Sequence, residues 1–218
     1  MKVAVAGAGK VGRSIARELI ANNHEVLLLD KDAGKAKQGA ASGASVLVVD
    51  ACEISSLEEA GLPSCQVVIA ATGDDKVNLV VALLAKTEYG VPRVVARVNH
   101  PKNEWLFDDS WGVDVAVSTP RMLSALVEEA VTVGDLVRLM TFRQGDANLV
   151  ELTLAPESPV VGKRVDEVTW PIDTALVAIV RESRVITPTP DDTLEAGDEL
   201  LFVSAEDQEE ALEDLLAV

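Results

Sequence analysis

Three glycines near the N-terminus, Gly7, Gly9 and Gly12, have a spacing that suits the binding of a phosphate group. The first glycine permits a tight turn, the second lets backbone approach a ligand, and the third lets a helix pack closely against a strand. The free backbone N–H groups at the start of such a helix attract an anion. Asp30 follows 18 residues after Gly12, where a carboxylate can accept hydrogen bonds from ribose hydroxyls. These residues together predict a nucleotide site.

The segments around these residues are the ones that such a site needs. Residues 3–6 form a short apolar run of the β type, and residues 26–29 form a second one that ends at Asp30. Between them, Ile15, Leu19 and Ile20 share one face of a predicted helix. Strand, glycine loop, helix, strand and acid are therefore in register, which is more specific than the glycine spacing alone. The alternative is a glycine-rich loop kept only for tight packing.

Apolar strands and helices continue to alternate through the first 118 residues. Further strands are predicted at residues 46–49, 66–71, 93–98 and 113–117, and helices at residues 31–39, 55–60, 77–86 and 105–110, with Ser55 as an N-cap. Near-continuous apolar strands are typical of a sheet buried on both faces, which predicts an α/β fold with a doubly wound, Rossmann-like parallel sheet. Ligands of such sheets bind at the carboxyl ends of the strands. Those ends carry Asp50, Thr72, Gly73 and Arg97.

A longer apolar stripe follows this α/β region. Thr119 and Pro120 have the residue types that begin a helix, and the stripe runs on to Gly134 and resumes over residues 136–140. We expect residues 119–146 to form a crossover helix and hinge that also contacts a second subunit. The alternative is a plain packing helix with a kink.

The remaining residues, 147–218, have the pattern of a small α+β lobe. Strands are predicted at residues 150–154, 175–180, 184–187 and 199–203, a helical turn at 165–168, and a closing acidic helix at 206–215. Residues 141–218 carry 18 Asp and Glu against 5 Lys and Arg. The predicted domains are therefore residues 1–118, 119–146 and 147–218.

The overall composition excludes several classes of protein. The formal net charge of −17 argues against nucleic-acid binding. No apolar run approaches the roughly 18 residues of a membrane-spanning helix, and the chain enters a strand directly, which argues against a signal peptide. Cys52 and Cys65 lack metal-site spacing and are expected to be free, buried thiols in a reducing cytosol.

The sequence offers little that could catalyse a reaction in the predicted crevice. A dehydrogenase needs a His, Lys or Tyr that exchanges a proton with the substrate. His24 and Tyr89 lie at helix ends, and His100 lies in a predicted turn beside Pro101. We therefore predict no catalytic residues and no metal site. A nucleotide pocket without reaction machinery favours a sensor, since ligand binding can shift a conformational equilibrium.

Several motifs together resemble one known family. They are residues 7–12 (GAGKVG), Asp30, residues 49–51 (VDA), 71–78 (ATGDDKVN) and 95–98 (VARV). In this combination they resemble the RCK (regulator of potassium conductance, or KTN) domain, and most closely the TrkA/KtrA-type regulatory subunits of bacterial potassium uptake systems. Residues 160–163 (VVGK) and 195–200 (EAGDEL) resemble the C-terminal lobe of the same family. The resemblance covers nearly the whole chain.

The resemblance implies a nucleotide-sensing subunit that gates a separate potassium-translocating membrane protein. It would be cytoplasmic, at the inner face of the membrane, and would form homodimers that build a ring, of eight copies for a chain with one RCK unit. The ligand would be NAD(H) or ATP/ADP, with the diphosphate at Gly7, Gly9, Lys10 and Val11, the ribose at Asp30, the adenine at Asp50 and Ala51, and phosphate at Arg97. The predicted cofactor-binding set is Gly7, Ala8, Gly9, Lys10, Val11, Gly12, Asp30, Lys31, Asp50, Ala51, Cys52, Ala71, Thr72, Gly73, Asn78 and Arg97.

One residue departs from the family pattern. Some relatives place an acid just after the proline of the crossover helix, where it helps to hold a divalent cation, and this chain has Arg121 there. The acidic second lobe also disfavours the anionic cyclic dinucleotide that some relatives bind. Two other hypotheses stay open: an NAD-dependent oxidoreductase of a small substrate, and a nucleotide-binding scaffold for another channel or antiporter.

Overall fold

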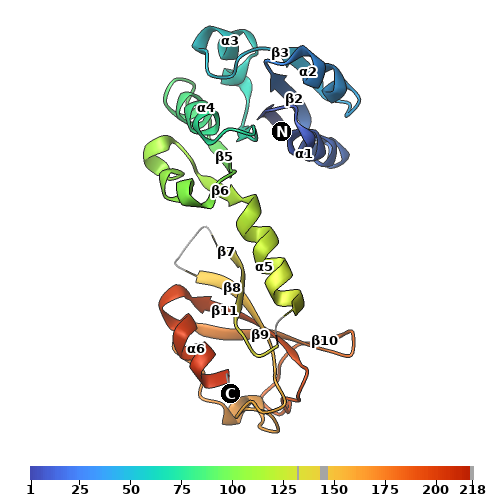
Figure 1. The fold of residues 1–218 in the computed structure, drawn as a ribbon, viewed down its shortest axis with the longest axis vertical. Coiled ribbons are helices and arrows are strands. Elements are labelled where there is room, and N and C mark those ends of the chain that lie inside the picture. Colours follow the sequence, from blue (N-terminus) through green and yellow to red (C-terminus); the bar gives the residue numbers. More distant parts are fainter. Residues whose placement is uncertain (132, 143–146, 217–218) are drawn as a thin grey trace. The chain divides into compact units, whose positions relative to one another are not determined.

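The computed structural model describes residues 1–131, 133–142 and 147–216, without the side chains of residues 128–130 (Figure 1). Its contacts divide the chain into two compact units, Met1–Pro120 and Arg121–Val218. Within the described residues, every helix is too short or too polar to cross a membrane.

The first unit is built on a six-stranded parallel sheet in the order β3-β2-β1-β4-β5-β6. The strands are β1 (Lys2–Ala6), β2 (Glu25–Asp30), β3 (Ser45–Val48), β4 (Val67–Ala70), β5 (Arg93–Val98) and β6 (Val115–Ser118). This order reverses direction between β1 and β4, and such a reversal opens a crevice at the carboxyl ends of the strands. The predicted doubly wound, Rossmann-like parallel sheet is confirmed.

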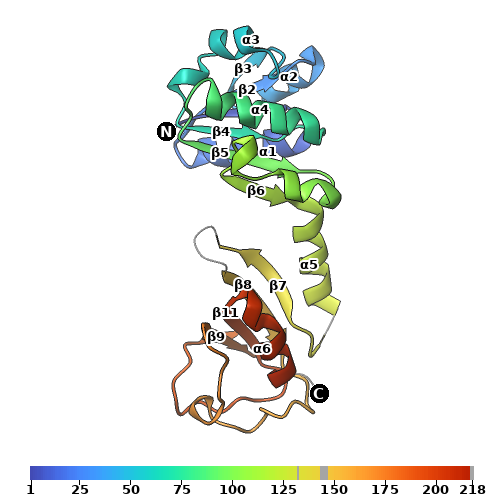
Figure 2. The same cartoon turned by 90° about the vertical axis from the view of Figure 1, so that its left-hand side faces the viewer.

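Helices cover both faces of this sheet (Figures 1 and 2). They are α1 (Lys10–Ala21), α2 (Ala33–Ala40), α3 (Ile54–Glu59) and α4 (Asp75–Thr87), with short 3₁₀ helices at Leu62–Ser64, Pro101–Leu106 and Asp109–Trp111. Ala16 of α1 packs with Val3 and Val5 on one face, whereas α3 and α4 pack on the other through Leu57 and Leu79. Because alternate residues of each strand face opposite sides, this double coverage explains why the strands are apolar throughout.

Two predicted helices of the first unit differ from the structure in their capping residue or in the type of helix. Asp50 Oδ1 accepts a hydrogen bond from Cys52 N at 2.9 Å, and Glu53 N donates to Asp50 O at 3.1 Å. This turn starts α3 at Ile54, so the prediction of Ser55 as N-cap was wrong. The predicted helix at 105–110 is replaced by the two 3₁₀ helices Pro101–Leu106 and Asp109–Trp111. His100 caps the first of these helices and Asp108 caps the second.

The helix α5 (Thr119–Val131) begins where the sequence predicted, but it does not resume after Gly134. Residues predicted as its continuation form strand β7 (Val137–Thr141), which pairs antiparallel with β8 (Ala147–Thr153). Gly134 has a φ of 93° and donates its N–H to Thr153 O at 2.9 Å. The left-handed backbone of Gly134 does not fit a continued α-helix. The backbone of β8 then supplies hydrogen-bond partners for residues 137–141 in an extended conformation. The predicted hinge boundary near residue 146 lies partly outside the described residues.

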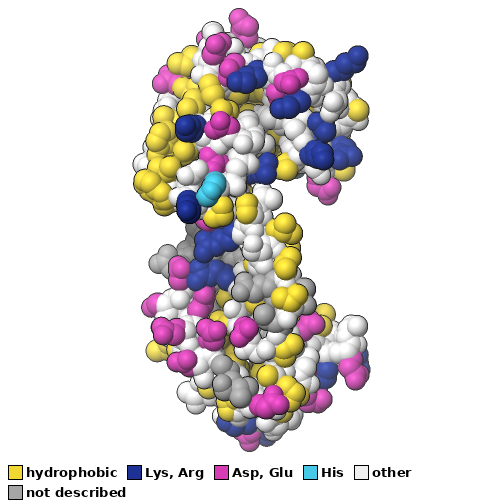
Figure 3. Space-filling view, in the orientation of Figure 1, with side chains coloured by type: hydrophobic (Ala, Val, Ile, Leu, Met, Phe, Trp, Pro, Cys, Tyr) yellow, Lys and Arg dark blue, Asp and Glu magenta, His cyan; other side chains and the backbone are white. Residues whose placement is uncertain are grey.

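The second unit contains an antiparallel sheet in the order β10-β9-β11-β8-β7. Its other strands are β9 (Thr174–Arg181), β10 (Arg184–Ile186) and β11 (Glu199–Ala205), and helix α6 (Glu209–Leu216) covers one side. Phe202, Leu152 and Leu212 are fully buried in its core, and burial of such a side chain contributes about 1.5–3 kcal/mol. The predicted α+β lobe is confirmed. Figure 3 shows Asp and Glu side chains spread over the visible face of this unit rather than gathered in one patch.

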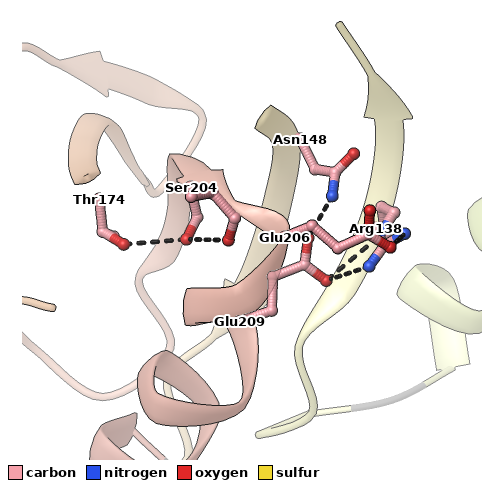
Figure 4. Close-up of polar contacts among 7 residues, drawn as sticks. Arg138, Asn148, Thr174, Ser204, Glu206 and Glu209 are labelled. Carbon is pink, nitrogen blue, oxygen red and sulfur yellow. Dashed lines mark hydrogen bonds and ion pairs between the residues drawn. The ribbon is translucent and has the colours of Figure 1, made fainter. Parts of the chain in front are cut away.

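A polar network attaches α6 to the sheet of the second unit (Figure 4). Glu209 accepts hydrogen bonds from Arg138 Nη2 at 2.7 Å and from Asn148 Nδ2 at 2.5 Å, and Glu206 accepts from Arg138 Nη1 at 2.9 Å. The Glu209 carboxylate thus joins β7 and β8 to the first turn of the helix. In the same part of the sheet, Thr174 Oγ1 and Ser204 Oγ lie 2.9 Å apart.

Candidate functional site

A cavity of about 640 Å³ opens at the carboxyl edge of the parallel sheet in the first unit. Segments from the ends of β1, β2, β4 and β5 meet there, as the reversal of strand order requires. Its lining residues are Gly7, Gly9, Lys10, Val11, Leu29, Asp30, Lys31, Lys35, Val49, Asp50, Ala51, Ala71, Thr72, Gly73, Asp74, Val77 and Arg97. The lining includes Lys10 in the first turn of α1 and Arg97 near the end of β5, so an anion would meet both side-chain charge and the helix N-terminus.

Gly7 and Gly12 have the packing roles that the spacing predicted, whereas the ligand-binding role of Gly9 stays a prediction. Gly7 has a φ of 110°, and a Cβ there would lie 2.9 Å from Ala71 O. A Cβ on Gly12 would lie 1.8 Å from Gly7 O, so α1 can approach β1 only because this residue has no side chain. Gly9 is different, because nothing lies within 4 Å of its would-be Cβ and it lines the cavity. Among the three glycines of the loop, only Gly9 therefore has open space at the position where a ligand would approach backbone.

Asp30 lies at the end of β2, against the glycine loop. Its Oδ2 accepts a hydrogen bond from Ala8 N at 2.8 Å and its Oδ1 accepts one from Asp32 N at 2.9 Å. Each carboxylate oxygen can accept more than one hydrogen bond, so Asp30 keeps capacity for a further donor. Across the cavity mouth, Lys31 Nζ lies 3.9 Å from Asp50 Oδ2. The Lys31 side chain is exposed and that of Asp50 is half-buried, and at this distance their attraction is weak.

The other wall of the cavity comes from the ends of β4 and β5. Thr72 and Gly73 follow β4, and Arg97 lies near the end of β5, where its Nε donates to Thr119 Oγ1 at 3.2 Å. Asp74 caps α4 by accepting from Lys76 N at 2.8 Å. These residues belong to the motif at 71–78 and to residues 95–98, which lie far apart from the glycine loop in the sequence. The fold brings all three motifs to one cavity.

Most of the predicted set lines this cavity, and four members lie elsewhere. Ala8 and Asn78 are fully buried behind the wall, Gly12 is packed against Gly7, and Cys52 is half-buried beyond Asp50. Burial, followed by the charge of Asp50, raises the pKa of the Cys52 thiol. Cys65 is buried as predicted, but the prediction that Cys52 is also buried was wrong. Whether any of the set contacts a ligand stays a prediction.

Five residues of the cavity wall lie outside the predicted set, namely Leu29, Lys35, Val49, Asp74 and Val77. Leu29 and Val49 were available as the last residues of predicted apolar strands. Asp74 belongs to the motif at 71–78. An Asp directly before an apolar helix is a typical N-cap, so its residue type could have placed it at this strand end. Lys35 lies one turn into α2 and gives no local sign that it faces the crevice, because only the packing of α2 decides that.

The residues considered for catalysis have structural partners. His100 Nδ1 accepts a hydrogen bond from Lys102 N at 3.2 Å, so this ring caps the following 3₁₀ helix. Tyr89 Oη donates to Ile54 O at 2.5 Å. His24 Nδ1 lies 3.4 Å from the N-terminal amine. These contacts agree with the interpretation of the three residues as parts of turns and helix ends.

Asp75, in the first turn of α4, is the most heavily hydrogen-bonded carboxylate near the cavity. Burial works to raise the pKa of this carboxyl, but hydrogen bonds from Asn103, Asn99 and the backbone of His100 outweigh it and hold the pKa below its usual range. A lowered pKa means that the folded chain stabilises the charged form. The resulting stability is present above the unfolded pKa of about 3.9 and is lost as the pH falls through the folded pKa.

We therefore expect Asp75→Asn to lower the free energy of unfolding at pH 7 by about 1–3 kcal/mol. The difference from the parent chain should shrink on acidification below about pH 4, because the parent carboxyl also becomes protonated there. Urea denaturation of both chains between pH 3 and 7 measures this. A difference that stays constant over that range would contradict the assignment.

Comparison with known proteins places the chain in a family. The TrkA-N domain matches residues 3–119 and the TrkA-C domain matches residues 149–217. The chain belongs to the TrkA family. It is 60% identical over 216 residues to the Trk system potassium uptake protein TrkA of Mycobacterium tuberculosis (strain CDC 1551 / Oshkosh), an alignment that covers 99% of this chain and 98% of that protein. The predicted family resemblance is confirmed.

Solved structures with the same fold include two from GsuK. The GsuK RCK domain aligns with 100% of this chain at a TM-score of 0.67 and 19% identity, over 48% of its own length. The GsuK channel bound to NAD aligns with 100% of this chain at a TM-score of 0.71 and 19% identity, over 39% of its own length. The chain thus spans less than half of either GsuK chain. The TrkA relative bears the name of a potassium uptake protein rather than of an enzyme.

Proposed function

We propose that this TrkA-family chain is a regulatory subunit that senses a nucleotide and gates a potassium-translocating membrane protein. The observation that carries the proposal is the single cavity at which the glycine loop, Asp30 and the Thr72–Arg97 wall meet. Near-complete alignment with a Trk system potassium uptake protein supports the link to potassium uptake. The NAD-bound state of the GsuK channel supports the choice of ligand class.

The proposed ligand is NAD(H), ATP or ADP, all of which share an adenosine ribose and a diphosphate. The diphosphate would lie on the N–H groups of Gly9 to Val11, the ribose would donate to Asp30, and the adenine would border Asp50 and Ala51. Arg97 would neutralise phosphate charge from the opposite wall. Asp30 would repel a 2′-phosphate, so NADP is not expected to bind well.

The proposed assembly is a homodimer that builds a ring against its membrane partner, at the inner face of the membrane. Support comes from α5, where Leu123, Leu126 and Val127 are each more than half exposed. Neighbouring exposed apolar residues on one helix mark an interaction site more often than isolated ones do. For a chain with one RCK unit, the ring would contain eight copies.

Titration calorimetry with NAD, NADH, ADP and ATP tests the ligand part of the proposal. We expect saturable binding of at least one of them, with no consumption of NADH in the presence of the chain. Absence of binding at millimolar concentration would overturn it, and turnover would support the oxidoreductase hypothesis instead. Potassium flux through a co-purified membrane protein, measured with and without nucleotide, tests the gating part. Co-purification with a different channel or antiporter would replace the proposed partner.

Arg97→Ala is expected to weaken the binding of NAD and ADP by about tenfold, or about 1.4 kcal/mol, because a charge-assisted contact to phosphate is lost. Affinity for adenosine should change by about twofold or less, since adenosine carries no phosphate. Arg93→Ala is the matched control, because Arg93 lies exposed at the opposite end of β5. Equal losses for ADP and adenosine would contradict the assigned role of Arg97.

A further inference from the structure

Two residues in the first turn of α4, Asp75 and Asn78, lie behind the wall of the cavity and not in its lining. Asn78 is fully buried and Asp75 is 8% exposed. They are three positions apart, so their side chains share one face of the helix. That face is turned toward the ends of β4 and β5.

The Asn78 amide bridges the two strand ends with both of its polar atoms. Its Oδ1 accepts hydrogen bonds from Thr72 N at 2.9 Å and from Thr72 Oγ1 at 2.6 Å. Its Nδ2 donates to Arg97 O at 2.8 Å and to Thr72 O at 3.3 Å. A single buried side chain thus joins the two residues that form opposite parts of this cavity wall.

The Asp75 carboxylate holds the backbone that leaves β5. Its Oδ1 accepts from Asn99 N at 2.6 Å and from Asn99 Nδ2 at 2.9 Å, and its Oδ2 accepts from His100 N at 3.0 Å and from Asn103 Nδ2 at 2.8 Å. Asn99 Nδ2 also donates to Thr72 O at 3.1 Å. Asn99 lies two residues after Arg97, so these bonds limit how the end of β5 can move.

These contacts lie just beyond the strand pairing of β4 and β5. The pairing of the two strands ends at Ala70 and Ala96, one residue short of Ala71 and Arg97. Past that point the sheet ladder no longer sets the distance between Thr72 and Arg97. The hydrogen bonds of Asn78 and Asp75 set this distance instead, because they fix backbone groups at the ends of β4 and β5 to the same turn of α4.

We propose that Asp75 and Asn78 are positioning residues for the nucleotide site, which set the separation between the Thr72–Gly73 segment and Arg97 without contacting the ligand. The inference rests on the proposed nucleotide-sensing function. It accounts for the motif at residues 71–78 as a unit: Thr72 and Gly73 form the wall, Asp74 caps the helix, and Asp75 and Asn78 hold the wall to β5.

The test compares Asp75→Asn with Asp114→Asn. The control carboxylate lies near the opposite end of β5, where Asp114 Oδ2 accepts from Val94 N at 2.6 Å and Oδ1 lies 2.8 Å from Lys86 Nζ. Both variants replace a carboxylate that holds strand β5, and both should lower the melting temperature. Only Asp75→Asn should weaken the binding of NAD and ADP, by about tenfold, while affinity for adenosine falls by about threefold or less. Asp114→Asn should bind all three ligands within about twofold of the parent chain.

If Asp75 has a purely structural role, Asp75→Asn should lower the melting temperature and leave the ratio of ADP affinity to adenosine affinity as in the parent chain. That outcome would overturn the inference but not the proposed function. A parent chain that binds none of the ligands would overturn both the inference and the proposed function. If Asp75→Asn does not fold, Asn103→Ala removes one of the four hydrogen bonds and should lower ADP affinity by about threefold. An Asn103→Ala chain that folds and binds ADP like the parent would also contradict the inference.

Discussion

Replacement of Gly12 by alanine is expected to lower the free energy of unfolding of the first unit by about 3 kcal/mol. The added Cβ would lie 1.8 Å from the carbonyl oxygen of Gly7, which is backbone and cannot rotate away. Helix α1 would have to move off β1, and the buried contacts of Ala16 with Val3 and Val5 would loosen with it. Urea denaturation followed by circular dichroism measures the loss.

Gly9→Ala is the matched control for this prediction. Gly9 has a φ of −67°, which alanine adopts without strain, and a Cβ there has no neighbour within 4 Å. We expect a loss of stability of about 1 kcal/mol or less, from the poorer N-cap alone. Because the new methyl group projects into the cavity space, affinity for NAD or ADP should fall by about tenfold or more. A Gly12→Ala chain as stable as the Gly9→Ala chain would contradict the packing argument.

Replacement of Asp30 by alanine is expected to lower both stability and nucleotide affinity. The buried N–H group of Ala8 would lose its acceptor, which costs about 1–3 kcal/mol. The ribose would lose its partner as well, so affinity for ADP should fall by about tenfold. Calorimetric titration with ADP and with 2′-deoxy-ADP separates the two effects. The parent chain should prefer ADP, and the Asp30→Ala chain should show little preference.

Asp32→Ala controls for the loss of stability in this experiment. Asp32 caps α2 by accepting from Gly34 N at 2.7 Å, but it lies outside the cavity lining. Its replacement should lower stability by about 1 kcal/mol and leave ADP affinity within about twofold of the parent value. If Asp32→Ala weakens ADP as much as Asp30→Ala does, the effect comes from stability and not from the ribose contact.

The order of elements in the first unit could be predicted because its signals are local. A strand buried on both faces reads as an apolar run, and the glycine spacing around residues 7–12 depends only on neighbouring residues. The carboxyl ends of parallel strands must lie at one edge of the sheet, so even the meeting of Asp30, Thr72 and Arg97 followed from the predicted topology. The same logic selected most of the cavity wall.

One failure of prediction occurred where a distant partner decides the outcome, and another where a neighbouring turn does. The residues that form β7 carry an apolar pattern that fits a helix, and they become a strand because β8 offers a hydrogen-bonded ladder. Ser55 is a good N-cap by type, but the local turn held by Asp50 places the cap at Glu53, two residues earlier. In both cases local preference differs by little between the alternatives. A tertiary contact chooses for β7, and a neighbouring turn chooses for α3.

The sequence by itself determined the α/β fold, the glycine loop with its acid, and the family to which the chain belongs, since each depends on local residue types and their spacing. Only the tertiary structure decided that Lys35 faces the cavity and that Asn78 lies behind its wall. Those positions depend on how α2 and α4 pack against strands remote in the sequence. A buried amide such as that of Asn78 needs all its partners at once, and only the folded chain brings Thr72 and Arg97 to it.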